Sequence, residues 1–341
     1  MTGAMYAAVS GLKAHMSALN VIGNNIANVN TNAYKASRFT FLESLYTSVR
    51  GGSNGTQQVG GKNPAQIGYG CSLGTIDLDM STKNYSPTGQ ALDCMIDGDG
   101  FFLVGDKDAS SPEALYLTRL GNLGFDSQGY LIDGQGKVVY GFLTTQEDGD
   151  ADPAVSPILT AIRLPMASTG TEDGGVVTGA GKPVYPTVDG DDGSGVVLDA
   201  TEDVLGRVVL DSVSIDEATG RISGTTAEGD PVIIGYLAIG KVDNPNGVTH
   251  VDGHYYQALD GAGTLHVTSL GGAVKTGDGD DALPILSSGK TSLVTGGLES
   301  SGTDLASEIT SMITVQRGYQ ANTRIVTVTD SMLEELVNMK R

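Results

Sequence analysis

Residues 305–337 read LASEITSMITVQRGYQANTRIVTVTDSMLEELV, and this stretch decides the fold. Apolar side chains recur in it at every seventh position, with Ile309 beside that row. A period of seven with one glycine and no proline predicts a single long amphipathic helix. At 1.5 Å per residue the helix would extend for roughly 50 Å, so we expect it to need a partner outside a compact core. The members of the row are Leu305, Met312, Tyr319, Val326 and Leu333.

A second apolar row lies near the start of the chain. Its members follow one another at steps of three and four, with Gly23 as the gap, which predicts another amphipathic helix over residues 3–27. Small residues such as Ala8, Gly11 and Ala18 lie opposite this row, where other helices could approach closely. Two matching rows, one near each end, predict a terminal coiled coil. The members of the second row are Met5, Val9, Leu12, Met16, Leu19 and Ile26.

The composition favours a β-rich middle and argues against nucleic acid. The 341 residues include 49 Gly and 6 Phe but no Trp, which is typical of many short strands and turns. The net charge is −20, whereas phosphate binding needs clustered Lys and Arg. No Asp or Glu precedes Glu43, so the N-terminal helix is nearly neutral, as expected of a helix packed on every side.

Cysteines and hydropathy set three further expectations. Cys71 and Cys94 are too few for a disulfide framework, and we expect plain thiols in or near strands. No basic region followed by an unbroken apolar run begins the sequence, so no cleavable signal peptide is expected. No segment approaches the about 20 apolar residues that span a bilayer, so no membrane insertion is expected.

Two clusters of potential metal ligands are better explained as turns. His250 and His254 flank Asp252, but the Glu and the helix of a His-Glu-x-x-His site are missing. Asp97 and Asp99 alternate with glycine as in a calcium loop, yet Phe101 occupies the fifth position, where an oxygen ligand belongs. We therefore expect strands and turns at both places and no metal.

Other catalytic or cofactor sites find no support. No glycine-rich stretch carries the Lys and the Ser or Thr of a phosphate loop. The four His and two Cys show no spacing that pairs a nucleophile with a base. The prediction is a protein that is not an enzyme and binds no cofactor.

An asparagine-rich run follows the first helix and is expected to stop it, because Asn side chains bond nearby backbone. It leads into NVNTNAYK at residues 28–35, directly after an apolar-seamed helix. This phrase resembles the N-terminal signature of the flagellar rod and hook family of axial proteins. Ala33 departs from it, since the family usually has Gly there and Gly adopts positive φ at low cost. The matching residues are Asn28, Asn30, Thr31, Tyr34 and Lys35.

The resemblance covers most of the chain outside residues 147–206. It is strongest at TGQALDCMIDGDGFF, residues 88–102, and it includes the C-terminal signature QRGYQAN at residues 316–322. Gly318 stands where Ala, Ser or Asn is more usual and costs about 0.5–1 kcal/mol of helix propensity. The signature residues in these phrases are Asp97, Gly98, Gly100, Phe101, Gln316, Arg317, Tyr319 and Asn322.

Pattern and resemblance together imply an α+β multidomain fold. The N- and C-terminal α-helices pair as a coiled coil, and the mostly-β middle domains are nested one inside the other. The expected parts are a terminal helical domain of residues 1–30 with 303–341, connecting segments 31–70 with 287–302, a β-rich core of 71–147 with 209–286, and a small inserted outer β domain of 148–208.

The resemblance implies a structural subunit of the bacterial flagellar hook. Such subunits polymerise into a bendable extracellular tube that couples motor torque to the filament, and they are exported without a cleaved signal peptide. The implied partners are further copies of the chain, the distal rod, the hook cap, the hook-filament junction protein, the hook length-control protein and the flagellar export apparatus.

Three alternatives remain open at this point. A distal rod subunit shares both terminal signatures but is rigid and usually shorter, and the long insert favours the hook. A junction protein matches the phrase at residues 97–102 less well. A secreted Gly-rich β adhesin would explain the middle of the chain but neither terminal signature.

Overall fold

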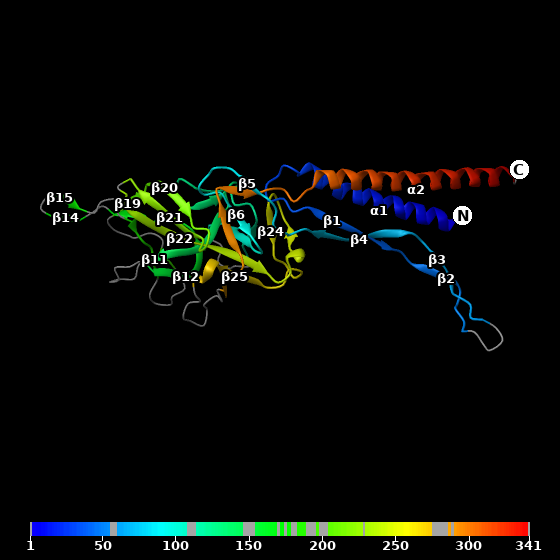
Figure 1. The fold of residues 1–341 in the computed structure, drawn as a ribbon, viewed down its shortest axis with the longest axis horizontal. Helices are drawn as coiled ribbons and strands as arrows, with labels where there is room; N and C mark the ends of the chain where they lie inside the picture. Colours follow the sequence, from blue (N-terminus) through cyan, green and yellow to red (C-terminus); the bar gives the residue numbers. More distant parts are fainter. Residues whose placement is uncertain are drawn as a thin grey trace. The chain divides into compact units, whose positions relative to one another are not determined.

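A computed structural model gives the fold, drawn as a ribbon in Figure 1. The chain divides into two compact units, which we call the helical unit (Met1–Asp79 with Ser301–Arg341) and the β unit (Met80–Ser300). The predicted division into four parts is finer than this and stays a prediction. The structure describes residues 2–54, 60–107, 114–145, 154–168, 171–173, 176–178, 183–188, 196–197, 204–227, 229–274, 286–287 and 290–339.

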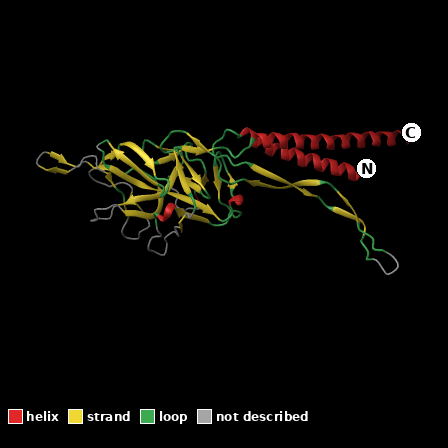
Figure 2. Cartoon of the chain, viewed as in Figure 1, coloured by secondary structure: helices red, strands yellow, loops and turns green. Residues whose placement is uncertain are grey.

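The helical unit contains both long helices, α1 (Thr2–Ala27) and α2 (Leu305–Met339). Figure 2 shows these helices in red and an otherwise mostly stranded chain in yellow. The prediction of terminal helices around a mostly-β middle is thus confirmed. Asp304 caps α2, since its Oδ1 accepts the N–H of Ala306 at 3.1 Å.

The two helices pack side by side in antiparallel directions (Figure 1). Asn25 Nδ2 donates to Glu308 Oε1 at 2.9 Å, whereas Gly11, further toward the start of α1, lies against Asn322. The buried side of α1 is formed mainly by small residues, which allows the helix axes to approach closely. Whether the pair forms a coiled coil stays a prediction. The buried residues of α1 are Ala8, Gly11, Ala14, Ala18, Ile22 and Asn25.

Gly11 and Gly318 are needed for this close approach. A Cβ atom at Gly11 would lie 2.5 Å from Asn322 Nδ2, and one at Gly318 would lie 2.8 Å from His15 Cε1. The unusual glycine of the C-terminal signature therefore leaves room for the His15 ring of the opposite helix.

A two-stranded ribbon packs against α1. Phe39 joins the apolar cluster between the helices, and the Phe41 ring meets the His15 ring edge-on at 5.3 Å between centroids. A two-stranded ribbon is marginally stable alone, so α1 supports it. The antiparallel pairs are β1 (Ser37–Glu43) with β4 (Cys71–Leu78), and β2 (Tyr46–Arg50) with β3 (Ala65–Gly68).

A sheet of 13 strands dominates the β unit. Its central strands β7 (Phe101–Gly105) and β11 (Val138–Thr145) are buried at every residue, on both faces. Strand β7 reads FFLVG, so neither of its faces carries a polar side chain. The main path runs β20 (Leu210–Ile215), β21 (Arg221–Thr226), β22 (Pro231–Val242), β11 (Val138–Thr145), β7 (Phe101–Gly105), β8 (Tyr116–Thr118), β24 (Tyr255–Gln257), β23 (Thr249–His250).

Further strands extend this sheet or form small sheets of two or three strands. The predicted insert, residues 148–208, contributes β12 (Ala154–Ala161) to the large sheet and several strands to separate small sheets. Its nesting as an outer domain stays a prediction. The additional strands of the large sheet are β9 (Leu123–Phe125), β10 (Leu131–Asp133), β12 (Ala154–Ala161), β25 (Leu265–Ser269) and β26 (Leu286–Ser287). The small sheets are β16 (Pro183–Val184) with β13 (Met166–Ser168) and β19 (Val204–Arg207), β14 (Thr171–Asp173) with β15 (Val176–Thr178), β17 (Thr187–Val188) with β18 (Val196–Val197), β27 (Ser292–Thr295) with β6 (Cys94–Asp97), and β28 (Gly297–Glu299) with β5 (Tyr85–Pro87).

The helix contact predicts different outcomes for two glycine substitutions in α1. Gly23→Ala meets open space and should raise the free energy of unfolding of the helical unit by about 0.5–1 kcal/mol through helix propensity. Gly11→Ala has the same propensity gain but pushes against Asn322, so it should give no gain or a loss. Urea unfolding followed by far-ultraviolet circular dichroism measures both, and equal gains would contradict the packing described.

Candidate functional site

Exposed apolar side chains gather in the helical unit. Among the described residues, the β unit holds only four large ones that are exposed, namely Tyr85, Val209, Val251 and Leu259, and all the others belong to the helical unit. Folded monomers seldom leave extended apolar patches in water. The helical unit is therefore the candidate assembly surface.

The predicted row on α1 lies beside the helix contact rather than in it. Val9 and Met16 are exposed, and Met5, Leu12, Leu19 and Ile26 are half-buried. Only Leu19 and Ile26 touch the cluster of Ala18, Ile22 and Val315 between the helices. The side of α1 that packs against α2 consists mainly of small residues, so the larger apolar side chains of α1 stay partly exposed.

The predicted row on α2 divides between two directions. Met312 packs into the helix contact and Val326 is half-buried. Leu305, Tyr319 and Leu333 are exposed, as is the neighbouring Ile309. Most of the row thus remains available for contacts outside this chain.

The N-terminal signature forms a hydrogen-bonded turn that ties the two helices together. Tyr34 Oη donates to Asn25 Oδ1 at 3.0 Å and accepts from Asn24 Nδ2 at 3.0 Å. Thr31 Oγ1 donates to Asn28 Oδ1 at 3.1 Å, and the backbone oxygen of Asn28 accepts from Ser301 Oγ at 2.8 Å. The signature residues therefore hold the end of α1 against the start of α2.

Asn25 is the centre of this turn, and the sequence reasoning did not single it out. Its Nδ2 donates to Ser37 O at 2.8 Å as well as to Glu308, and its Oδ1 accepts the N–H of Ser37 at 3.0 Å. Thr303 Oγ1 donates to its backbone oxygen. A signal was present, because Asn25 follows Ile22 by three residues on the buried side of α1.

Two other signature positions have distinct environments. Lys35 is buried at 1% exposure, and Asn30 is exposed. Ala33 adopts φ 58°, the left-handed conformation that a glycine would enter freely. For an alanine this conformation costs roughly 1–2 kcal/mol. The turn nevertheless has the backbone conformation that the family's usual glycine would favour at this position.

The C-terminal signature lies across the middle of α2. Asn322 is half-buried against Gly11, whereas Gln316, Arg317 and Tyr319 are exposed. Asn322 therefore serves the contact with α1, and the other three lie on the exposed sides of α2.

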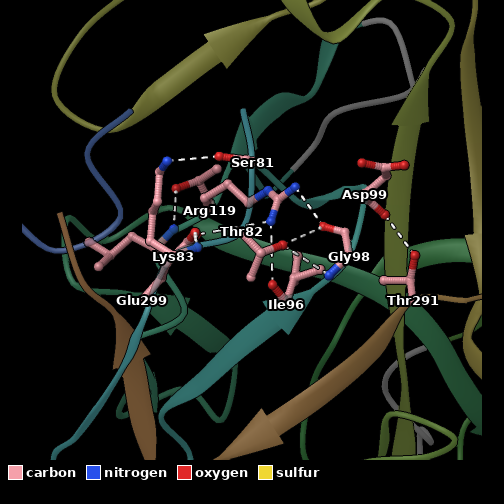
Figure 3. Close-up of polar contacts among 11 residues, drawn as sticks. Ser81, Thr82, Lys83, Ile96, Gly98, Asp99, Arg119, Thr291 and Glu299 are labelled. Atoms are coloured by element: carbon pink, nitrogen blue, oxygen red, sulfur yellow. Dashed lines mark hydrogen bonds and ion pairs between the residues drawn. The ribbon is translucent and has the colours of Figure 1, made fainter. Parts of the chain in front are cut away.

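In the β unit, the central signature forms the turn between β6 and β7 (Figure 3). Gly98 and Gly100 adopt φ values of 112° and 138°, which favour glycine. A Cβ atom at Gly100 would also lie 2.4 Å from Ile239 Cγ2. Asp97 ends β6, and the buried Phe101 begins β7.

Arg119 binds this turn from the end of β8. Its Nη2 donates to Gly98 O at 2.8 Å, and its guanidinium lies 5.4 Å from the centre of the Phe101 ring. Nη1 lies 4.0 Å from Glu299 Oε2, with the two side chains 2% and 1% exposed. Glu299 Oε1 accepts the N–H of Lys83 at 2.8 Å.

This buried ion pair joins the end of β8 to the last strand of the β unit, and the Lys83 bond to Glu299 adds the start of the unit. Burial lowers the pKa of Arg119, and the carboxylate of Glu299 opposes that change. The pair was missed as a site, because its members lie in separate phrases of the resemblance. No local sequence pattern pairs these two residues.

Possible chemistry elsewhere in the described residues is limited. They contain no group of three or more His, Cys, Asp or Glu placed to hold a metal ion. The His250 ring packs edge-on against Tyr256 at 5.2 Å. Cys94 is fully buried, and burial raises the pKa of its thiol, while Cys71 is half-buried on β4. No described helix has the length and hydropathy to cross a bilayer.

Two family models match the ends of the chain that form the helix pair, which defines the class as a flagellar axial protein. Residues 5–35 match the flagella basal body rod protein model, and residues 294–339 match the flagellar basal body rod FlgEFG protein C-terminal model.

Several relatives extend the match to the whole chain. The flagellar basal-body rod protein FlgG of Bacillus subtilis is 32% identical over 341 residues, covering 100% of both chains. The flagellar hook protein FlgE of Borreliella burgdorferi is 26% identical over 449 residues, again covering 100% of both. The flagellar hook protein FlgE of Treponema pallidum is 32% identical over 44% of this chain and 32% of its own length. The chain belongs to the flagellar hook and basal-body rod family, whose members are structural proteins and not enzymes.

Removing the buried carboxylate of Glu299 should destabilise the β unit strongly. Glu299→Ala leaves the Arg119 cation buried without its counter-charge, which costs about 3–5 kcal/mol. Asp106→Ala is the matched control, because it breaks the exposed pair with Lys137 and should cost at most about 1 kcal/mol. Urea unfolding of the full chain measures both variants, and similar losses would contradict the role given to Glu299.

Proposed function

We propose that the chain is the structural subunit of the flagellar hook. In this role it polymerises with copies of itself into a bendable extracellular tube that couples motor torque to the filament. The observation that carries the proposal is the concentration of exposed apolar side chains on the terminal helices, in a chain of the axial family.

Assembly follows from what the helix pair leaves uncovered. Val9 and Met16 on α1, and Leu305, Tyr319 and Leu333 on α2, gain little from the other helix of the same chain. Burying such side chains against other copies is worth about 1.5–3 kcal/mol each when complete. Helices packed as a coiled coil would form a layer that resists twisting, because interdigitated side chains do not slide past one another.

The β unit suits a shell that bends. Its described residues expose few large apolar side chains, and the sequence between its described strands is rich in Asp and Gly. Contacts between acidic, weakly apolar surfaces are easily exchanged, which allows neighbouring subunits to shift as a hook rotates.

A distal rod subunit is the second candidate. The full-length identity of 32% to a FlgG rod protein favours it, while the insert beyond residue 147 favours the hook. Both share the helix pair and the self-assembly surface, and they differ in whether the polymer bends.

The partners expected in either case follow from the family. They are the distal rod, the hook cap, the hook-filament junction protein, the hook length-control protein and the flagellar export apparatus, which would deliver the subunit without a cleaved signal peptide. No nucleic acid, cofactor or membrane insertion is part of the proposal.

Electron microscopy of the polymerised chain separates the two candidates. A curved tube supports the hook, and a straight rod supports its alternative. Failure of the purified chain to form any tube under conditions that polymerise related axial proteins would overturn the proposal.

A single charge in the exposed row of α2 should block assembly without unfolding the chain. Tyr319 is 37% exposed in the helical unit, so Tyr319→Asp should fold normally yet prevent polymerisation. Met312→Asp should also prevent it but should in addition loosen the helix contact.

Val209→Asp is the control for this experiment, since Val209 is 79% exposed on the β unit. Sedimentation and circular dichroism report polymer and fold. Normal tubes from the Tyr319→Asp chain would refute the assignment of this row to assembly.

A further inference from the structure

Hydroxyl side chains cover one face of the hairpin that β20 and β21 form at the edge of the large sheet (Figure 1). Ser212 Oγ and Thr225 Oγ1 lie 2.8 Å apart across the two strands, and Ser214 Oγ and Ser223 Oγ lie 3.5 Å apart. Both pairs are directly opposite in the strand register, so all four side chains share one face. The other face packs on the core through Ile222. The hydroxyl groups are therefore not part of the core.

These hydroxyl groups line an open pocket of about 250 Å³. Typical small-molecule sites measure about 300–1,000 Å³, so this pocket suits a small ligand. Pro231 and Ile233 of the neighbouring strand β22 form an apolar side. The pocket thus combines hydrogen-bonding groups with an apolar surface. Its polar lining residues are Ser212, Ser214, Arg221, Ser223 and Thr225.

Arg221 brings a positive charge into the pocket. Its Nε is shielded from solvent and has no hydrogen-bond partner among the described residues. A buried N–H without a partner costs free energy, which an acceptor bound in the pocket would recover. A guanidinium bonds a carboxylate or phosphate through paired N–H groups. The unmet donor therefore indicates a ligand with an anionic group.

The carboxylate of the hairpin's own turn does not meet this need. Asp216 accepts hydrogen bonds from Thr219 Oγ1 at 2.6 Å and from the N–H of Ala218 at 3.3 Å. The bond from Thr219 is the main cause that lowers the pKa of Asp216, and the charge of Arg221 contributes without an ion pair between the two. Asp216 is thus held within the turn, and Arg221 remains available to an anion from outside.

The surroundings of Arg221 favour a sugar over a bare anion. An inorganic anion would use the guanidinium but would leave most of the hydroxyl groups and the apolar side without a contact. A sugar ring has hydroxyl groups at its rim and apolar C–H groups on its faces, which matches both parts of the lining. The net charge of −20 opposes any anion, but salt screens charges that lie further away than about 8 Å.

We propose that this pocket binds a sugar that carries a carboxylate, such as one unit of an acidic polysaccharide. Arg221 bonds the carboxylate. Ser214 and Ser223 exchange hydrogen bonds with the ring hydroxyls, since each hydroxyl can both donate and accept. The apolar face of the ring packs on Pro231 and Ile233. The proposal does not depend on the proposed function.

Saturation-transfer NMR of the full chain with glucuronate as the probe tests this site. Glucuronate should bind at least about tenfold more tightly than glucose, which lacks the carboxylate, and than acetate, which lacks the ring. Arg221→Gln should weaken glucuronate binding at least about tenfold, because it removes the charge that bonds the carboxylate.

Two further variants separate the site from general charge effects. Arg38→Gln is the matched control, since it removes the same charge from β1, where the side chain is 77% exposed, and it should leave glucuronate binding unchanged. Ser214→Ala with Ser223→Ala should weaken glucuronate binding several-fold and leave acetate binding unchanged. Circular dichroism of all variants should match the natural chain, because none of the substituted residues is buried.

The contrary outcomes are equally definite. No signal from glucuronate at millimolar concentrations would overturn the proposal, and so would unchanged affinity in the Arg221→Gln chain. Equal binding of acetate and glucuronate would overturn the assignment to a sugar. None of these outcomes bears on polymerisation, so the proposed function is tested separately.

Discussion

The close antiparallel approach of α1 and α2 is the constraint on which the helical unit depends. It is possible because α1 presents Gly11 and Ala18 to α2, and Gly318 makes room for His15 in return. Small residues bury little apolar area, so this contact alone provides a modest stabilisation. Among the described residues, larger apolar side chains therefore remain exposed on the outer sides of both helices.

Buried polar groups fix the ends of the elements in both units. In the helical unit, Asn25 accepts and donates hydrogen bonds that join α1, the following strand and Glu308 of α2. In the β unit, Arg119 and Glu299 link the turn before β7 with the final strand β28. Such groups are costly when one partner is lost, so they specify one arrangement rather than adding much stability. The proposed role in transmitting torque would use this kind of definition at the ends of each unit.

The sequence predicted the helices well and their contact less completely. The seven-residue rows placed helices at residues 3–27 and 305–337, within two residues of α1 and α2. An apolar row has the same period whether it faces its own partner or another copy. The two rows were expected to meet each other, whereas α2 packs on the small-residue side of α1, where the sequence had indicated that other helices could approach. Arg119 and Glu299 are distant in sequence, and no local pattern pairs them. The glycine at position 318 was predicted to cost helix propensity, and its compensation became visible only with the His15 ring beside it.

Hydroxyl-radical footprinting of the monomer and the polymer tests the central claim most directly, because methionine and tyrosine side chains report their own exposure through oxidation. Tyr6 and Met16 on α1, and Met332 and Met339 on α2, are all exposed in the single chain. They should be oxidised several-fold more slowly in the polymer, while Tyr85 in the β unit serves as a reference within the same molecule. Equal oxidation of the four residues in monomer and polymer would contradict the account, since the outer sides of the helices would then remain uncovered after assembly.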